Sequence, residues 1–302
     1  MSQGRSVLLL VNRTRPGAGE VAESFVSGLR AAGIEVRVTV DDEVGSRLPG
    51  AVTMHDPAQA ALGCELVVVL GGDGTILRGT ELARPHGTPV LGVNLGRVGF
   101  LAEAERSDHG SVAKAVAERH YTVEERLTLE VAVLHEGEVV SRTWALNEAS
   151  VEKAARERML DILVEIDGRP LSRWGADGVI CATPTGSTAY AFSAGGPIVW
   201  PEVEALLVVP LSAHALFARP VVVSPASVIA VELLRGAPGG VLWCDGRRLV
   251  ELMPGARVVV RRSPDPVRLA RLHSRPFTDR LVRKFQLPVD GWHASGEAER
   301  PA

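Results

Sequence analysis

Several features that mark particular protein classes are scarce or missing in this chain of 302 residues. Its three cysteines, Cys64, Cys181 and Cys244, are spaced for neither a zinc site nor a disulfide framework, so we expect small buried side chains in a reducing compartment. Only three of the 33 basic residues are lysine, the charges are interspersed, and the formal net charge is −3. We therefore expect no nucleic-acid partner.

Long apolar runs are also missing. The run at residues 7–11 is too short for a signal peptide or a membrane span, and the stretch 221–234 is broken by Ser224, Pro225, Ser227 and Glu232. We therefore expect a cytoplasmic protein without a membrane partner.

The first third of the chain alternates strand-like and helix-like segments. The pattern predicts strands at 7–11, 34–40, 66–70 and 89–93, and helices at 21–32, 57–62, 76–83 and 110–119. Such alternation is typical of a doubly wound parallel sheet with helices on both faces. We therefore predict an α/β domain over residues 1–120.

After this domain the sequence pattern changes. Apolar residues alternate with other residues along short predicted strands, which are joined by glycine and proline turns, and Asp167-Gly168 is a hairpin signal. This pattern predicts a β-rich domain over 121–275. Helical pattern returns at 276–290, and that helix could pack back on the first domain. The small and charged residues of 291–302 indicate a frayed tail.

The most informative segment is Gly71-Gly72-Asp73-Gly74-Thr75, directly after the predicted strand 66–70. Loops at the carboxyl ends of parallel strands bind ligands, and glycines followed by a helix N-terminus suit phosphate. A dinucleotide fingerprint would need a third glycine where Leu77 stands, and a P-loop would need a Gly-Lys-Ser/Thr sequence, which the chain lacks. These absences argue against a Rossmann dehydrogenase and a Walker-type ATPase.

Asp73 is the unusual member of this loop, because a carboxylate repels phosphate. Its presence indicates chemistry, namely accepting the proton of a hydroxyl that attacks phosphorus. The alternative is that Asp73 only caps the helix that follows.

A second polar cluster runs from Gly175-Ala176-Asp177-Gly178 to Thr183-Pro184-Thr185-Gly186-Ser187-Thr188-Ala189-Tyr190. Its five hydroxyl side chains within residues 183–190 could be a surface turn, or donors and acceptors for a ligand. An apolar continuation toward Gly195 favours a packed, ligand-facing segment.

These motifs resemble the NAD kinases, within the superfamily that also holds phosphofructokinases and diacylglycerol-type lipid kinases. The glycine loop is shared across that superfamily, whereas residues 185–190 and Leu146-Asn147-Glu148 are more particular to NAD kinases. Residues 94–101 also match the family, and the resemblance extends from about residue 7 to 287. It implies an NAD kinase/diacylglycerol kinase-like fold, with a β-rich NAD-binding domain after the α/β domain.

The resemblance also implies roles for particular residues. Asp73 would be the base for the 2′-hydroxyl of the adenosine ribose of NAD, in a phosphate loop of Gly71, Gly72, Gly74 and Thr75. NAD-binding residues would be Asp73, Gly74, Arg78, Asn147, Glu148, Arg158, Asp177, Thr188, Ala189, Tyr190 and Ser193.

Each of these residues also has a plainer interpretation. Asn147 and Glu148 could be an exposed polar pair, and Arg158 part of a solvated charged face. Asp177-Gly178 and Asp245-Gly246 could be simple turns. We keep Asp177 as a site residue, and for Asp245 we weigh a role in the site and a simple turn equally.

The function that follows is phosphoryl transfer from ATP or polyphosphate to NAD, giving NADP, with Mg²⁺ held mainly by the donor phosphates. The family resemblance implies a homodimer or homotetramer, in which Arg158 could contact a neighbouring subunit. The alternatives are a diacylglycerol-type lipid kinase and a non-catalytic NAD(P) sensor.

Overall fold

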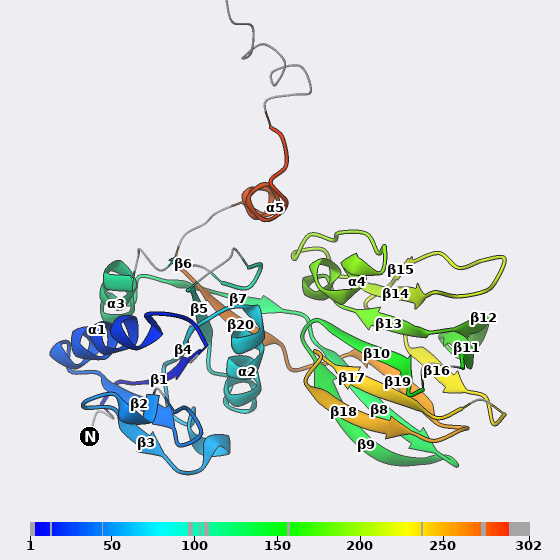
Figure 1. The fold of residues 1–302 in the computed structure, drawn as a ribbon, viewed down its shortest axis with the longest axis horizontal. Coiled ribbons are helices and arrows are strands. Elements are labelled where there is room, and N and C mark those ends of the chain that lie inside the picture. The colour runs from blue at the N-terminus through cyan, green and yellow to red at the C-terminus, as the bar shows by residue number, and fades with distance from the viewer. Residues whose placement is uncertain are drawn as a thin grey trace, which may run out of the picture. The chain divides into compact units, whose positions relative to one another are not determined.

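The computed structural model describes residues 4–12, 14–43, 45–95, 99–102, 104–105, 109–155, 158–236, 238–272 and 276–289. The chain forms two compact units, residues 1–124 with 268–302 and residues 125–267 (Figure 1). Within the described ranges, no helix combines the length and the apolar character needed to cross a bilayer.

The first unit is built on one mostly parallel sheet. Its strand order is β3-β2-β1-β4-β5-β20-β7, with β6 beside β5, and every pairing from β3 to β20 is parallel. The α/β fold expected for the start of the chain is confirmed. The strands are β1 Ser6–Val11, β2 Glu35–Thr39, β3 Val52–Met54, β4 Leu66–Leu70, β5 Val90–Asn94, β6 Ala104–Glu105, β7 Thr122–Arg126 and β20 Val267–Arg271.

Helices cover both faces of this sheet. Helices α1 (Ala18–Ala31) and α3 (His109–Glu118) pack on one face, where Leu9 and Val68 join their core cluster. Helix α2 (Asp73–Ala83) packs on the other face (Figure 1). There a side chain at Gly79 would press against Val69 of β4, so glycine permits the close approach.

Two expectations about the first unit change in detail. The helix predicted over 57–62 is only a 3₁₀ turn, Pro57–Gln59, although the Asp56 side chain caps it at the Ala58 amide as its sequence suggested. Helix α2 starts earlier than residue 76, because the glycine loop itself turns into the helix.

The strand order places two loops at the same edge of the parallel sheet. The sequence order of strands reverses between β1 and β4, which is the switch point where open parallel sheets bind ligands. Asn12 follows β1 and Gly71 follows β4, both at the carboxyl end of the strand.

The second unit is a sandwich of two antiparallel sheets. Their orders are β15-β14-β13-β10-β17-β18 and β12-β11-β16-β19-β8-β9. The strands are β8 Leu129–His135, β9 Glu138–Ala145, β10 Glu148–Lys153, β11 Leu160–Ile166, β12 Arg169–Ala176, β13 Gly178–Ala182, β14 Leu206–Leu211, β15 Val221–Val223, β16 Ile229–Leu233, β17 Gly240–Cys244, β18 Arg248–Leu252 and β19 Arg257–Arg262. This confirms the β-rich second domain.

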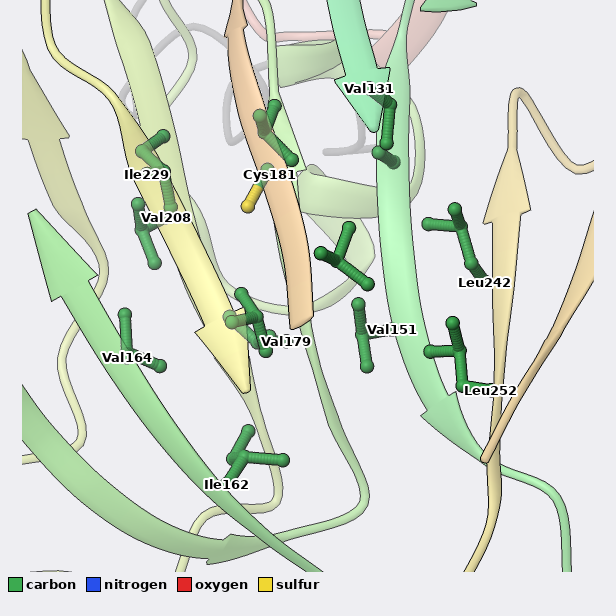
Figure 2. Packing of buried hydrophobic residues seen from close by; sticks show 14 of the residues in the cluster. Val131, Val151, Ile162, Val164, Val179, Cys181, Val208, Ile229, Leu242 and Leu252 are labelled. Carbon is green, nitrogen blue, oxygen red and sulfur yellow. The ribbon is translucent and has the colours of Figure 1, made fainter. Parts of the chain in front are cut away.

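Aliphatic side chains from both sheets form the core of the sandwich. Figure 2 shows Val151, Val179 and Leu242 of one sheet facing the same interior as Ile162 and Val131 of the other. Alternate residues along each strand point inward, which is why the sequence alternates. Cys181 and Cys244 belong to this core, and burial raises the pKa of both thiols to about 12. The expectation of buried cysteines holds for both.

Two hairpins of this unit turn on an aspartate followed by glycine. Asp167 and Gly168 have φ of 53° and 73° between β11 and β12, and Asp245 and Gly246 have φ of 55° and 62° between β17 and β18. Positive φ at both central residues suits the twist of a two-residue hairpin, and glycine adopts it without strain. Both sequence signals for turns are confirmed.

The limits of the second unit differ from the expected range 121–275. Strand β20 lies in the parallel sheet of the first unit, where Leu269 pairs with Val90 of β5. Its alternating pattern resembles that of the preceding sandwich strands, so pattern alone could not assign it. Helix α5 (Phe277–Phe285) also belongs to the first unit, and residues 290–302, including the predicted tail, lie outside the described residues.

Candidate active site

The glycine loop of the first unit turns directly from β4 into α2. Gly72 is the N-cap residue, and its carbonyl accepts from the amides of Thr75 (2.9 Å) and Ile76 (3.0 Å). Among the described residues, the structure gives no hydrogen-bond partner to the amides of Gly72, Asp73 and Gly74. The loop therefore presents the donors and the positive end of the helix dipole that bind phosphate.

Asp73 does not cap this helix. Its carboxylate instead accepts two backbone hydrogen bonds from a distant segment, from the amide of Phe100 (3.0 Å) and the amide of Leu101 (3.1 Å). Gly99 permits this arrangement, since a side chain at that position would overlap the carboxylate. A carboxylate has about four lone-pair sites, so two amides orient Asp73 and leave room for a substrate hydroxyl.

Asn12 supports the same loop from β1. Its side-chain amide donates to the Thr75 hydroxyl at 3.1 Å, and its backbone amide donates to the carbonyl of Leu70 at 2.9 Å. A side chain at Gly71 would collide with Thr75 and make a tight contact with Asn12. Gly71 and Thr75 thus shape the loop, and Asn12 is a supporting residue that no local motif indicates, because it lies some 60 residues earlier in the chain.

Two arginines lie near the loop. Arg78, on α2, forms an ion pair with Asp41 at 2.5 Å, so the guanidinium is held toward the end of β2. Exposed Arg15 reaches Gly72, with Nη2 4.0 Å from the position a side-chain carbon there would take. Arg15 places a positive charge beside the amides of the loop and was not identified from the sequence.

In the second unit, the Leu146-Asn147 turn leads into β10 at Glu148, and Asp245 holds this turn. The Asp245 carboxylate accepts from the amides of Leu146 (3.0 Å), Asn147 (2.7 Å) and Glu148 (3.4 Å). Arg248 adds an ion pair at 2.7 Å. Asp245 is therefore both a turn residue and a buried anchor, which decides the question that its sequence left open.

The segment 183–190 packs against that turn. The Thr183 hydroxyl donates to the Leu146 carbonyl (2.6 Å), and the Thr183 amide donates to the Asn147 carbonyl (2.9 Å). Ser187 and Thr188 also direct their hydroxyls to carbonyls of their own turn. Three of the five hydroxyls that could have served a ligand therefore build the turn, since backbone carbonyls at a buried turn need donors.

Glu148 is buried beside this anchor. Burial raises the pKa of its carboxyl to about 8, and the nearby Asp245 carboxylate adds to the rise, while the Tyr190 amide, 3.4 Å from Oε2, opposes it. The pKa of Asp245 is also raised by burial, against hydrogen bonds from Leu146, Asn147 and Arg248. At neutral pH the protonated Glu148 can both donate and accept.

We expect the free energy of unfolding to depend on pH through the proton on Glu148. The folded state retains it up to a pH of about 8, whereas the unfolded chain releases it above about 4.5. The stabilisation is therefore complete below about pH 4.5 and is lost as the pH rises toward 8, at up to about 1.4 kcal/mol per pH unit. Glu148→Gln should flatten this part of the pH dependence in urea unfolding.

The exposed Glu138 of the same unit gives the matched control, because Glu138→Gln makes the same change from carboxyl to amide at a site without burial. Unfolding curves at about pH 5, 6.5 and 8 suffice. An unchanged pH dependence in Glu148→Gln would show that this carboxyl is not buried as a neutral acid.

Two further candidates contact side chains of β10. Tyr190 is partly exposed, and its hydroxyl lies 3.5 Å from Oε2 of Glu152. Burial and Glu152 raise the pKa of Tyr190. Asp177, just before β13, forms an ion pair with Lys153 at 2.5 Å. The antiparallel pairing of Glu148 with Ala182 therefore places Glu148 and Asp177 at opposite ends of the β10–β13 pair.

The last three candidates of this unit lie in a turn, at the end of a helix and before a strand. Ala189 joins the 3₁₀ turn Thr185–Thr188 to α4 (Tyr190–Ser193), which ends with an exposed Ser193. Arg158 is exposed two residues before β11. Of the matching segment 94–101, residues 96–98 lie outside the described residues.

Comparisons with known proteins cover both units. The chain matches the profile of the ATP-NAD kinase N-terminal domain over residues 7–121 and that of the C-terminal domain over 146–272. It is 61% identical over 293 residues to NAD kinase 2 of Streptomyces coelicolor, covering 96% of this chain and 97% of that protein. It is 59% identical over 305 residues to the NAD kinase of Thermobifida fusca, covering 98% and 93%.

Solved structures give the same result. The yeast NADH kinase complexed with NADH matches with a TM-score of 0.84 and 25% identity, over 99% of this chain and 91% of that one. An NAD kinase from Archaeoglobus fulgidus in complex with ATP matches with a TM-score of 0.71 and 26% identity, over 94% and 100%. These relatives support neither the lipid-kinase nor the sensor alternative. The chain belongs to the NAD kinase family of phosphotransferases.

Proposed function

We propose that this chain transfers the terminal phosphoryl group of ATP to the 2′-hydroxyl of the adenosine ribose of NAD. Asp73 takes the hydroxyl proton as the oxygen attacks phosphorus, and the bond from phosphorus to the ADP oxygen breaks, giving NADP and ADP. The observation that carries this proposal is a carboxylate oriented by two amides at the start of α2, next to three amides without a partner among the described residues. The base and the phosphate-binding donors thus share one loop.

The amides of Gly72, Asp73 and Gly74 would bind the donor phosphates, supported by Gly71 and Thr75. Such donors stabilise the charge that develops on the transferred group. The A. fulgidus enzyme with ATP supports ATP as the donor, and polyphosphate is the alternative. Arg78 would bind nucleotide only after leaving its ion pair with Asp41.

For NAD, the turn at Asn147 and Glu148, with the neighbouring segment Thr188, Ala189, Tyr190 and Ser193, would provide the binding wall. Asp177 would add hydrogen bonds if its pairing with Lys153 opens. The partly exposed Tyr190 offers both a ring face and a hydroxyl to the ligand. We further propose a cytoplasmic homo-oligomer in which Arg158 contacts the NAD of a neighbouring subunit.

Mg²⁺ would be held mainly by the donor phosphates, because the loop around Asp73 offers backbone amides and a single carboxylate. Backbone N–H groups donate hydrogen bonds and do not bind cations, whereas phosphate oxygens do. The ion would neutralise charge on the transferring phosphoryl group.

The test is an incubation of purified protein with NAD, Mg²⁺ and ATP, with polyphosphate in a parallel tube. An NADP-specific dehydrogenase quantifies the product. We expect NADP with ATP and none when Mg²⁺ is omitted. If NADP forms with polyphosphate and not with ATP, polyphosphate is the donor in place of ATP. If NADP forms with neither donor, the proposal is refuted.

A further inference from the structure

The segment that orients Asp73 is itself held by the C-terminal helix of the same unit. The Phe100 carbonyl accepts from Nη1 of Arg280 on α5 at 3.0 Å, while the Phe100 amide donates to Asp73. The next residue has the same arrangement, since the Leu101 carbonyl accepts from Nη1 of the buried Arg271 at 3.2 Å. Two residues, Phe100 and Leu101, therefore connect the Asp73 carboxylate to two arginine side chains.

The Phe100 ring adds an apolar contact. Its centroid lies 6.1 Å from the Phe277 ring and 5.9 Å from the Phe285 ring, both on α5. Lys284 lies over the same ring at 5.9 Å. Positions 277, 281 and 285 are four residues apart, so they share one face of the helix, and Leu281 between them is buried. Aromatic pairs at these separations are stabilising, so the helix packs on Phe100 in a defined position.

We propose that α5 positions the catalytic carboxylate, with Phe100 and Arg280 as positioning residues. The helix fixes residues 100 and 101, and their amides fix both oxygens of Asp73. The reactive geometry of a base is sensitive to small displacements, and about 1 Å can cost up to about 10²-fold in rate. This inference rests on the proposed role of Asp73 as the base. It assigns a kinetic role to a helix some 200 residues away in the chain.

The experiment compares a chain that ends before Pro276, and so lacks α5, with a chain that ends at Val289 and retains it. The first should lose about 10- to 100-fold in kcat with unchanged KM for NAD and ATP, and the second should behave as wild type. Because the shortened chain could fail to fold, Arg280→Ala is made as well and should lower kcat by a smaller factor. Arg280→Lys should recover part of that loss, and Thr278→Ala, on an exposed side of α5, should lose none.

The decisive readout is coupling to Asp73. If α5 acts through that carboxylate, Arg280→Ala should cause no further loss of rate in an Asp73→Asn background. An equal loss in both backgrounds, or a rise in KM with kcat unchanged, would overturn the inference.

Amide hydrogen exchange of residues 99–102 separates this inference from the proposed function. Arg280→Ala should accelerate exchange at Phe100 and Leu101, and so should loss of α5. If wild type makes no NADP, the proposed function fails, while the exchange rates still show whether α5 holds this segment. Unchanged exchange would overturn the inference whatever the activity.

Discussion

Asp73→Asn should lower kcat by about 10²- to 10⁴-fold, the usual contribution of a general base, while NAD binding is largely retained. Asparagine keeps the size of the side chain but cannot take the proton of the ribose hydroxyl. It can also accept only one of the two amide hydrogen bonds from Phe100 and Leu101, because its NH₂ group faces the other donor. That loss costs about 1 kcal/mol, which is too little to unfold the unit.

The measurement is the initial rate of NADP formation together with NAD binding by calorimetry. Asp56→Asn is the matched control in the same unit, since Asp56 caps a short 3₁₀ turn and asparagine caps equally well. Turnover at the wild-type rate in Asp73→Asn would remove Asp73 from the chemistry. A lost NAD affinity with normal kcat would make Asp73 a binding residue instead.

Gly186→Ala should raise the KM for NAD by roughly 10- to 100-fold, the range expected when a binding segment is misplaced by about 1 Å. A side-chain carbon at position 186 would overlap the carbonyl oxygen of Asn147 and lie 2.8 Å from its Cα. These are backbone atoms in a turn fixed by Asp245 and Thr183. Moving this turn would therefore break hydrogen bonds. Either Asn147 or the turn 185–188 must shift away from its position.

Gly236→Ala is the control in the same unit, because its added methyl group meets no atom of the described residues within 4 Å and its φ is not positive. Steady-state kinetics against NAD would be recorded with thermal unfolding, since crowding of this kind also costs about 1–3 kcal/mol of stability. An unchanged KM in a folded Gly186→Ala protein would show that the contact of Gly186 with Asn147 does not shape the NAD site.

Much of the architecture could be predicted because the chain carries local signals. Continuous aliphatic runs such as residues 66–70 predict buried parallel strands, and the alternation along β8 and β11 predicts sandwich strands. The glycine loop could be chosen as a candidate phosphate site because such a site is formed by the amides of neighbouring residues in one turn. Asp73, Gly71 and Thr75 could therefore be chosen from the amino-acid sequence alone.

Contacts between distant residues required the tertiary structure. The sequence left open whether Asp245-Gly246 is a simple turn, and only folding places that carboxylate on the amides of residues 146–148, about a hundred positions away. In the same way Phe100 and Arg280 have no local pattern that relates them to Asp73. The sequence by itself determined the parallel α/β sheet, the β-rich second domain and the place of the glycine loop, because side-chain periodicity and turn chemistry are local. Tertiary structure decided which groups orient that loop, because buried hydrogen-bond donors and acceptors find their partners across the whole fold.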